Sequence, residues 1–224
     1  MNGSTTGTST GTKTDGRVER GNQTRRLVLA RTMDIASVEG LEGLSLGRIA
    51  TELKLSKSGV FALFGSKEEL QLATVKAAVV VFGARVVAPL ADIPPGARRV
   101  RELCRSWLAY SRERVFPGGC FFYAVGAEFD ARTGPVHDAV ARTHHDWTTY
   151  LEQALAEARA ADEFAAYLDA EQVTFEIIAL MEAANARSVL LGDDSAYDRA
   201  ERGITARLRS VATDRGRTAL ADPA

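Results

Sequence analysis

The stretch at residues 44–70, LSLGRIATELKLSKSGVFALFGSKEEL, constrains the fold of this chain more than any other. It contains two short runs with apolar residues at helical spacing, and a serine precedes each run. Ser45 and Ser56 can each cap a helix by accepting a backbone N–H bond, so the helices should begin at about Leu46 and Lys57. Two short helices that share an apolar face across a tight turn are typical of the DNA-binding helix-turn-helix.

Longer helices are predicted on both sides of this motif. Apolar residues at spacings of three and four predict a helix from about Asn22 to Glu39. Gly40 can end that helix, because glycine tolerates the left-handed conformation. Ser66 can cap a further helix, which should continue to about Pro89 and join this three-helix head to the rest of the chain.

The whole chain is predicted to be all-α, with a three-helix helix-turn-helix domain followed by a helical body. Its 224 residues are 46% apolar, which is enough to bury the cores of one small and one medium domain. The first twenty residues are rich in Gly, Ser and Thr and have little to bury, which favours disorder. The predicted divisions are a disordered tail at 1–20, a DNA-binding domain at 21–67, an effector-binding and dimerisation domain at 68–214, and a frayed C-terminus at 215–224.

Five helices are predicted in the body after the connecting helix. Residues 94–96 and 117–119 contain Pro-Pro-Gly and Pro-Gly-Gly, which break the chain on either side of the first of these helices. Pro135 suits the first turn of the third, where its missing N–H is not needed. The predicted ranges are 97–114, 120–130, 135–160, 169–191 and 195–212.

Charge is divided unevenly between the two predicted domains. Residues 1–67 hold 10 Lys and Arg and 6 Asp and Glu, a net charge of +4, whereas residues 68–224 hold 18 and 23, a net charge of −5. A basic head on an acidic body suits a head that binds the phosphates of nucleic acid. Without the motif, this difference would be explained equally well as ordinary surface scatter.

The predicted helices of the head resemble the N-terminal domain of the TetR family of transcriptional regulators. Order, spacing and residue type agree over about residues 22–75. The resemblance implies a homodimer that binds a palindromic DNA operator, most often as a repressor, and that a small-molecule ligand in the body releases. The matching positions are Thr24, Val28, Leu29 and Gly40, then Ser45, Leu46, Ile49 and Ala50, then Leu55, Ser56, Lys57, Val60, Phe61, Phe64, Ser66, Lys67, Glu68 and Leu70.

The resemblance also implies which residues contact DNA. Two polar groups of the family pattern are missing, since Phe61 replaces the usual tyrosine and Leu63 replaces a frequent histidine or tyrosine. Lys54 replaces the turn glycine, and a left-handed conformation there would cost about 1–2 kcal/mol. The predicted DNA-binding residues are Lys57, Ser58 and Gly59 in the major groove, with Arg25, Ser45, Arg48, Phe61 and Lys67 along the backbone.

Aromatic residues gather in the middle helices of the predicted body. Pockets between helices are mostly apolar with a few polar groups, so these residues can line a ligand cavity. For each ring taken alone, packing in the core is the commoner role, and the resemblance is what favours a cavity. The predicted ligand-binding residues are Trp107, Phe121, Phe122, Trp147, Phe175 and Met181, with Glu128, Glu182 or Asn185 as polar anchors.

The last two predicted helices carry apolar faces with small residues such as Ala183 and Ala184. Such a pair can bury its outer face against a twofold copy and form a four-helix bundle. The alternative is that the two helices only close the core of the monomer. We expect the dimer, because a helix-turn-helix protein gains affinity when two heads contact successive major grooves.

Other function classes find less support. His144 and His145 are adjacent on a predicted helix and point about 100° apart, so no metal site, catalytic site or cofactor is expected. Cys104 and Cys120 form no disulfide framework, although a thiol-based redox sensor on the same scaffold is an alternative. A helical enzyme or binding module with a degenerate head is another. No apolar stretch is expected to span a membrane, and the expected location is the cytoplasm.

Overall fold

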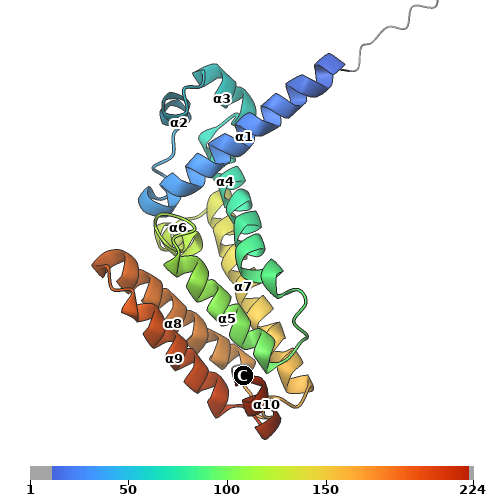
Figure 1. Cartoon of the computed structure of the whole chain (residues 1–224). Coiled ribbons are helices and arrows are strands. Elements are labelled where there is room, and N and C mark those ends of the chain that lie inside the picture. The colour runs from blue at the N-terminus through green and yellow to red at the C-terminus, as the bar shows by residue number, and fades with distance from the viewer. Residues whose placement is uncertain (1–11, 222–224) are drawn as a thin grey trace, which may run out of the picture.

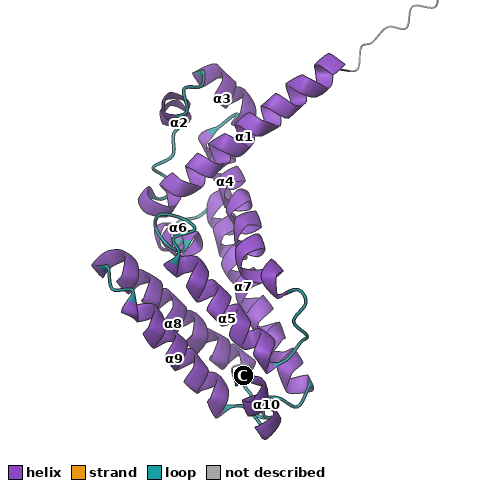
Figure 2. Ribbon diagram, in the orientation of Figure 1, coloured by secondary structure: helices purple, strands orange, loops and turns teal. Residues whose placement is uncertain are grey.

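The computed structural model describes residues 12–221, which fold into helices and contain no β-strand (Figures 1 and 2). The helices of the head are α1 (Thr12–Glu39), α2 (Leu46–Glu52) and α3 (Lys57–Phe64), and α4 (Lys67–Phe82) connects the head to the body. A π-helical turn, η1 (Gly83–Val87), and a 3-10 turn, η2 (Ala88–Leu90), continue α4. The helices of the body are α5 (Ala97–Arg112), α6 (Phe121–Phe129), α7 (Pro135–Ala160), α8 (Ala170–Leu191), α9 (Ser195–Ser210) and α10 (Asp214–Ala219).

Local capping chemistry fixes the helices of the head, and the three predicted serine caps are confirmed. Ser45 Oγ accepts from the N–H of Arg48, and Ser56 Oγ accepts from the N–H of Gly59, at 3.1 and 3.0 Å. Ser66 caps α4 in the same way. Each cap satisfies a backbone donor that the first turn of a helix leaves without a partner.

The start of α1 differs from the prediction, because this helix begins at Thr12 and not at about Asn22. Residues 12–20 therefore do not form the disordered tail that was expected for 1–20, and residues 1–11 lie outside the described part of the chain. Contacts along the helix support the extension, since Arg26 pairs with Glu19 at 3.3 Å and Thr24 donates to the carbonyl of Arg20. In Figure 1 this part of α1 projects away from the molecule.

The chain end also differs from the prediction of a frayed C-terminus. α10 packs against α5, and Leu220 is only 2% exposed. The buried guanidinium of Arg101 donates to the carbonyl oxygens of Leu220 and Ala221 at 2.6 and 2.9 Å. The prediction failed because these contacts come from α5, more than a hundred residues earlier in the chain.

The connecting helix corrects one more expectation. No stretch was expected to be apolar enough to span a membrane, but the continuous helix Lys67–Leu90 is long and apolar enough by length and composition. One-third of its most apolar window is buried inside the protein. In the fold it joins head to body, with polar contacts on its buried side: Thr74 Oγ1 donates to Thr32 Oγ1 at 2.8 Å, and Gln71 Nε2 donates to the carbonyl of Leu41.

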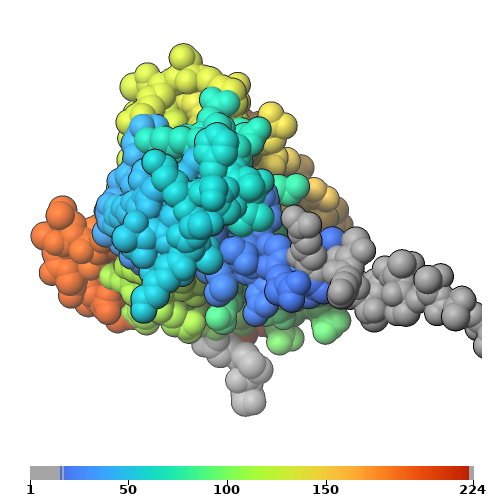
Figure 3. Space-filling model, turned by 90° about the horizontal axis from the view of Figure 1, so that it is seen from above, coloured from blue at the N-terminus to red at the C-terminus, as the bar shows by residue number. Residues whose placement is uncertain are grey.

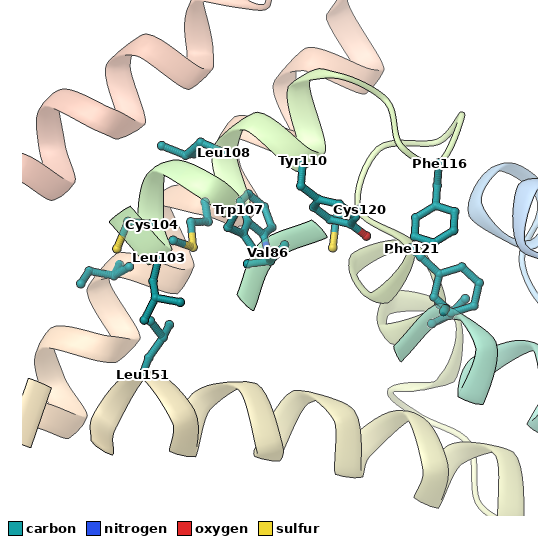
Figure 4. Close-up of a cluster of buried hydrophobic side chains, with 14 of the residues drawn as sticks. Val86, Leu103, Cys104, Trp107, Leu108, Tyr110, Phe116, Cys120, Phe121 and Leu151 are labelled. Atoms are coloured by element: carbon teal, nitrogen blue, oxygen red, sulfur yellow. The ribbon is translucent and has the colours of Figure 1, made fainter. Parts of the chain in front are cut away.

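The core of the body surrounds α5, which packs against α7, α8 and α9. Trp107 and Tyr110 project from α5 toward Cys120 and Phe121 at the start of α6 (Figure 4). α8 and α9 lie side by side as an outer pair (Figure 1). Gly203 lets them approach closely, because a Cβ at this position would lie 3.1 Å from Leu180 Cδ1.

Candidate functional site

The first surface with functional features is the N-terminal end of α3, at the end of the molecule that faces the viewer in Figure 3. Lys57, Ser58 and Gly59 are all exposed there. Phe61 is 56% exposed on the same helix, which is unusual for a large apolar ring. Lys54 adopts the predicted left-handed conformation, with φ of 55°. Among the described residues, neither Lys54 nor Lys57 has an acidic partner, so both ammonium groups are available to an anion.

The other predicted DNA-binding residues already have partners inside the head. Arg48 binds Glu39 through two nitrogens and Glu52 through a third. Lys67 donates to the carbonyl and carboxylate oxygens of Glu42 at 2.8 and 2.9 Å. These bonds lower the pKa values of Glu39, Glu52 and Glu42, because each carboxylate accepts from a cation.

Arg25 and Ser45 are likewise occupied. Arg25 donates to the carbonyl of Leu63 at 2.8 Å and lies over the ring of Phe64, 4.5 Å from its centroid. Ser45 is the cap of α2, so its oxygen already accepts a bond. Of the eight predicted residues, only Lys57, Ser58, Gly59 and Phe61 lie together on the open face of α3. The sequence did not reveal that Arg25, Arg48 and Lys67 bond to groups elsewhere in the head.

The junction of head and body is held by a carboxylate that the sequence suggested as a ligand anchor. Glu128 of α6 accepts from the backbone N–H groups of Leu41 and Glu42 at 2.6 and 2.9 Å. It sits so close that a Cβ on Gly40 would lie 2.5 Å from its oxygen. A second contact is the bond from the N–H of Gly118 to Ser37 Oγ. Glu128 therefore fastens the α1–α2 loop to the body, and it does not belong to the lining of the cavity described next.

A cavity of about 420 Å³ lies inside the body, next to the end of the connecting helix. This is within the size range of small-molecule sites. Residues from α4, η1, η2 and α5 to α8 surround it, so it touches both the connecting helix and the body. Its lining comprises Val79, Phe82, Gly83, Val87, Ala88, Trp107, Cys120, Phe122, Tyr123, Thr143, His144, Asp146, Trp147, Thr148, Tyr150, Ile178, Met181 and Glu182.

Four of the six predicted ligand-binding residues line this cavity, namely Trp107, Phe122, Trp147 and Met181. The other two do not. Phe121 is fully buried and packs against Phe116, with ring centroids 5.5 Å apart. Phe175 points outward from α8 and is 70% exposed. Both residues are aromatic, as expected for a cavity lining, but helical spacing alone did not reveal which side of each helix faces the cavity.

Of the three suggested polar anchors, only Glu182 faces the cavity. Asn185 is buried elsewhere, where its oxygen accepts from Ser111 Oγ and from the N–H of Cys120, both at 2.8 Å. Burial raises the pKa of Glu182, although the nearby His144 acts in the opposite direction. The sequence missed Asp146 and His144 as lining residues, because their helical region was weighed only as a metal site.

Phe82, which the sequence analysis also missed, is the centre of the aromatic lining. Its ring makes edge contacts with Phe122, Trp147 and Tyr110, with centroid separations of 5.6, 5.1 and 5.5 Å. It is the last residue of α4, immediately before the π-helical turn. Short π-helical segments are frequent at functional sites. A molecule in the cavity would thus touch the end of the helix that carries the head.

The outer face of α8 is the third feature. Apolar and small residues recur on this face at spacings of three and four and form one stripe, of which Ala186 is half-buried and the others are exposed: Phe175, Ala179, Ala183, Ala186 and Leu190. Leu190 is 82% exposed. An exposed apolar stripe on a surface helix is a candidate site of association.

Family comparisons cover both parts of the chain. A family described as "Bacterial regulatory proteins, tetR family" matches residues 28–74, and one described as "Tetracyclin repressor-like, C-terminal domain" matches residues 96–204. No curated protein matches the sequence.

Solved structures share this fold at low sequence identity. A TetR transcriptional regulator from Chloroflexus aurantiacus is 22% identical, with a TM-score of 0.80 over 87% of this chain and 98% of that one. A putative regulator from Saccharomonospora viridis, in complex with choline, is 17% identical with a TM-score of 0.72 over 86% and 99%. AibR, in complex with isovaleryl coenzyme A and operator DNA, is 18% identical with a TM-score of 0.63 over 79% and 95%.

Proposed function

The chain belongs to the TetR family of transcriptional regulators, and on that premise we propose that it is a repressor that binds a palindromic operator as a dimer and is released by a small molecule. Members of this family are DNA-binding regulators and not enzymes. The observation that carries the proposal is the open N-terminal end of α3, where Lys57 has no acidic partner among the described residues and lies beside Ser58 and Gly59.

For DNA binding, we propose that α3 enters the major groove with Lys57, Ser58 and Gly59 toward the bases. Helix N-termini and lysine side chains both favour negative charge, so this end of α3 suits the groove and its phosphates. Lys54 in the preceding turn adds a second ammonium group on the same side. Arg25 supports the recognition helix through its bond to the carbonyl of Leu63, whereas the bonds of Arg48 and Lys67 hold α2 and the loop before it within the head.

For effector binding, we propose the cavity beside Phe82. Two of the structural neighbours hold different small molecules, isovaleryl coenzyme A and choline, so the ligand of this chain has to be inferred from its own cavity. A ligand there contacts the end of α4 directly, and it contacts α6 through Phe122. It would favour one arrangement of these helices over another, and thereby change the separation of the two heads.

For assembly and location, we propose a homodimer formed through α8 and α9 in the cytoplasm. The apolar stripe of α8 supports this interface. Membership of the family, and the polar contacts on the buried side of α4, favour a soluble protein over a membrane-spanning one.

The test is a fluorescence-anisotropy titration of the protein against the DNA upstream of its own gene at two salt concentrations. Lys57→Ala should weaken binding by about tenfold. It should also reduce the slope of log affinity against log salt concentration by about one, the value for one lost phosphate contact. Lys76→Ala is the matched control, because Lys76 is an exposed lysine on α4 away from the open face of α3. Equal binding to unrelated DNA, unaffected by Lys57→Ala, would refute the proposal.

A further inference from the structure

Apart from His144, the ionisable side chains of Asp and Glu type are the charged groups that line the cavity beside Phe82. Asp146 of α7 and Glu182 of α8 contribute carboxylates, whereas no lysine or arginine belongs to the lining. Asp146 is exposed at the edge of the cavity, and Glu182 is partly buried. Within the described residues, neither carboxylate makes a hydrogen bond or an ion pair. A partly buried carboxylate without a partner is costly, so the site is poised for a cation.

His144 is the one lining residue that can offset this charge. Its Nε2 lies 3.1 Å from the carbonyl oxygen of Phe122. A carbonyl oxygen only accepts, so Nε2 carries a proton in this contact. The ring of His144 therefore uses this proton for the bond to Phe122.

Aromatic rings form most of the remaining wall. Six of the lining residues are aromatic, which is a large share of such a cavity: Phe82, Trp107, Phe122, Tyr123, Trp147 and Tyr150. Trp147 and Tyr150 lie in a stack, with centroids 6.2 Å apart and planes inclined by 19°. The faces of such rings attract cations, and cages of this kind bind quaternary ammonium groups.

We propose that the cavity selects an organic cation, a quaternary or tertiary ammonium group on an apolar body, with Glu182 as its counter-charge. This inference rests on the proposed function, in which the cavity holds the effector. The rings pack against the apolar body and the alkyl groups around the nitrogen. The carboxylate attracts the positive charge of the ligand, so it favours the cation over a neutral molecule of the same shape. Burial raises the pKa of Glu182, and a bound cation would lower it again.

The chain provides its own probe, because both of its tryptophans, Trp107 and Trp147, line the cavity. Tryptophan fluorescence is titrated with benzyltrimethylammonium, with its neutral carbon isostere neopentylbenzene, and with benzenesulfonate. The cation should bind about tenfold more tightly than the neutral isostere, and the anion should bind most weakly.

Glu182→Gln should lower the affinity for the cation by about tenfold and leave that for neopentylbenzene within about twofold. Glu182→Asp keeps the charge and should retain the preference for the cation. Glu171→Gln is the matched control, since Glu171 is exposed on α8 and does not line the cavity. Thermal unfolding of each variant verifies that it is folded.

Neutral and cationic probes of equal affinity, an unchanged preference in folded Glu182→Gln, or no quenching by any probe would overturn the inference. Operator binding is measured separately by anisotropy, so the two proposals can fail independently. Binding of the cation without loss of operator affinity would leave the ligand class standing and refute release by an effector. Operator binding that depends on Lys57, with no cation preference, would refute only the ligand class.

Discussion

At the scale of single residues, Phe61 is an apolar ring on a surface that otherwise presents lysine and serine. It is 56% exposed and projects from α3 among the groups proposed to bind DNA. A ring without a hydroxyl can contact sugars or thymine methyl groups, but it donates no hydrogen bond to a phosphate. We therefore expect the affinity of the head for DNA to depend more on Lys57 and on backbone N–H groups than it would with a tyrosine at this position.

We predict that Phe61→Tyr tightens operator binding. One added hydrogen bond to a charged phosphate oxygen should contribute about 1 kcal/mol, which is about fivefold in affinity. Anisotropy titrations at one salt concentration measure the change. Tyr167→Phe is the control, because Tyr167 is an exposed ring between α7 and α8, outside both the head and the stripe of α8, so changing its hydroxyl should leave operator binding unchanged. A weaker or unchanged affinity would place the Phe61 ring against an apolar part of the DNA.

The two cysteines are predicted to be unreactive in the folded protein. Burial raises the pKa of the Cys104 thiol to about 12 and that of the Cys120 thiol to about 11. Below these pH values the neutral thiol dominates, and the thiolate is the reactive form. A thiol reagent at pH 8 should label both cysteines only after unfolding, and peroxide should leave operator binding unchanged. Rapid labelling of Cys120 in the folded state would instead favour the thiol-based sensor.

Sequence reasoning at this scale succeeds where the interaction is local. The caps at Ser45, Ser56 and Ser66 join residues three positions apart, and all three were predicted correctly. The roles of Arg48 and Lys67 were not predictable, because Glu39 and Glu42 reach them only once the head is folded. A list of basic residues in the motif therefore overestimates the charge that remains available to DNA.

At the scale of secondary-structure elements, α6 is a second link between the cavity and the head, beside α4. Phe122 at its start lines the cavity, and Glu128 near its end accepts from the N–H groups of Leu41 and Glu42. The nine residues of α6 form a rigid rod, so a displacement at one end is passed to the other. Glu128 is therefore a positioning residue for the head.

We predict that Glu128→Gln weakens the coupling between ligand and DNA. The amide keeps one acceptor oxygen but loses the charge, so the junction should lose about 1–2 kcal/mol of stability. Thermal unfolding measures this loss, and the ligand-induced fall in operator affinity should become smaller. Asp130→Asn is the matched control, because Asp130 is an exposed carboxylate just after α6. An unchanged response to ligand would mean that α4 alone carries the signal.

Helices with strong periodicity were predictable to within a few residues, as for α7 at Pro135–Ala160. α10 was not, because DRGRTA carries almost no apolar pattern. Its position depends on tertiary contacts: a Cβ on Gly216 would lie 1.8 Å from the carbonyl oxygen of Glu163, so only glycine allows this approach. Of the rings that line the cavity, Trp107, Phe122 and Trp147 were predicted, whereas Phe82 depended on where α4 ends.

At the scale of the whole molecule, the basic surface and the cavity lie in different parts of the chain. The head, with a net charge of +4 over residues 1–67, presents the end of α3 to solvent, whereas the body, with −5 over residues 68–224, encloses the cavity. The apolar stripe of α8 lies on the outside of the body. A repulsive charge on the body discourages its own contact with DNA, so binding concentrates on the head.

We predict that the protein in solution has about twice the mass of the 24.1 kDa chain, and that the stripe of α8 holds the two copies together. The double variant Phe175→Glu with Leu190→Glu introduces two like charges that would face each other across a twofold axis, so light scattering should report a monomer. Since the two heads no longer bind as a unit, operator affinity should fall by about a hundredfold.

Val80→Glu is the matched control for this variant. Val80 is an apolar residue on α4 that is 68% exposed but does not belong to the stripe. Its replacement adds a charge to a different apolar surface, so the protein should stay dimeric and keep its operator affinity. If instead Val80→Glu yields the monomer and the double variant remains dimeric, the two copies meet along the connecting helix. The effector cavity, which lies beside α4, would then be close to the dimer interface.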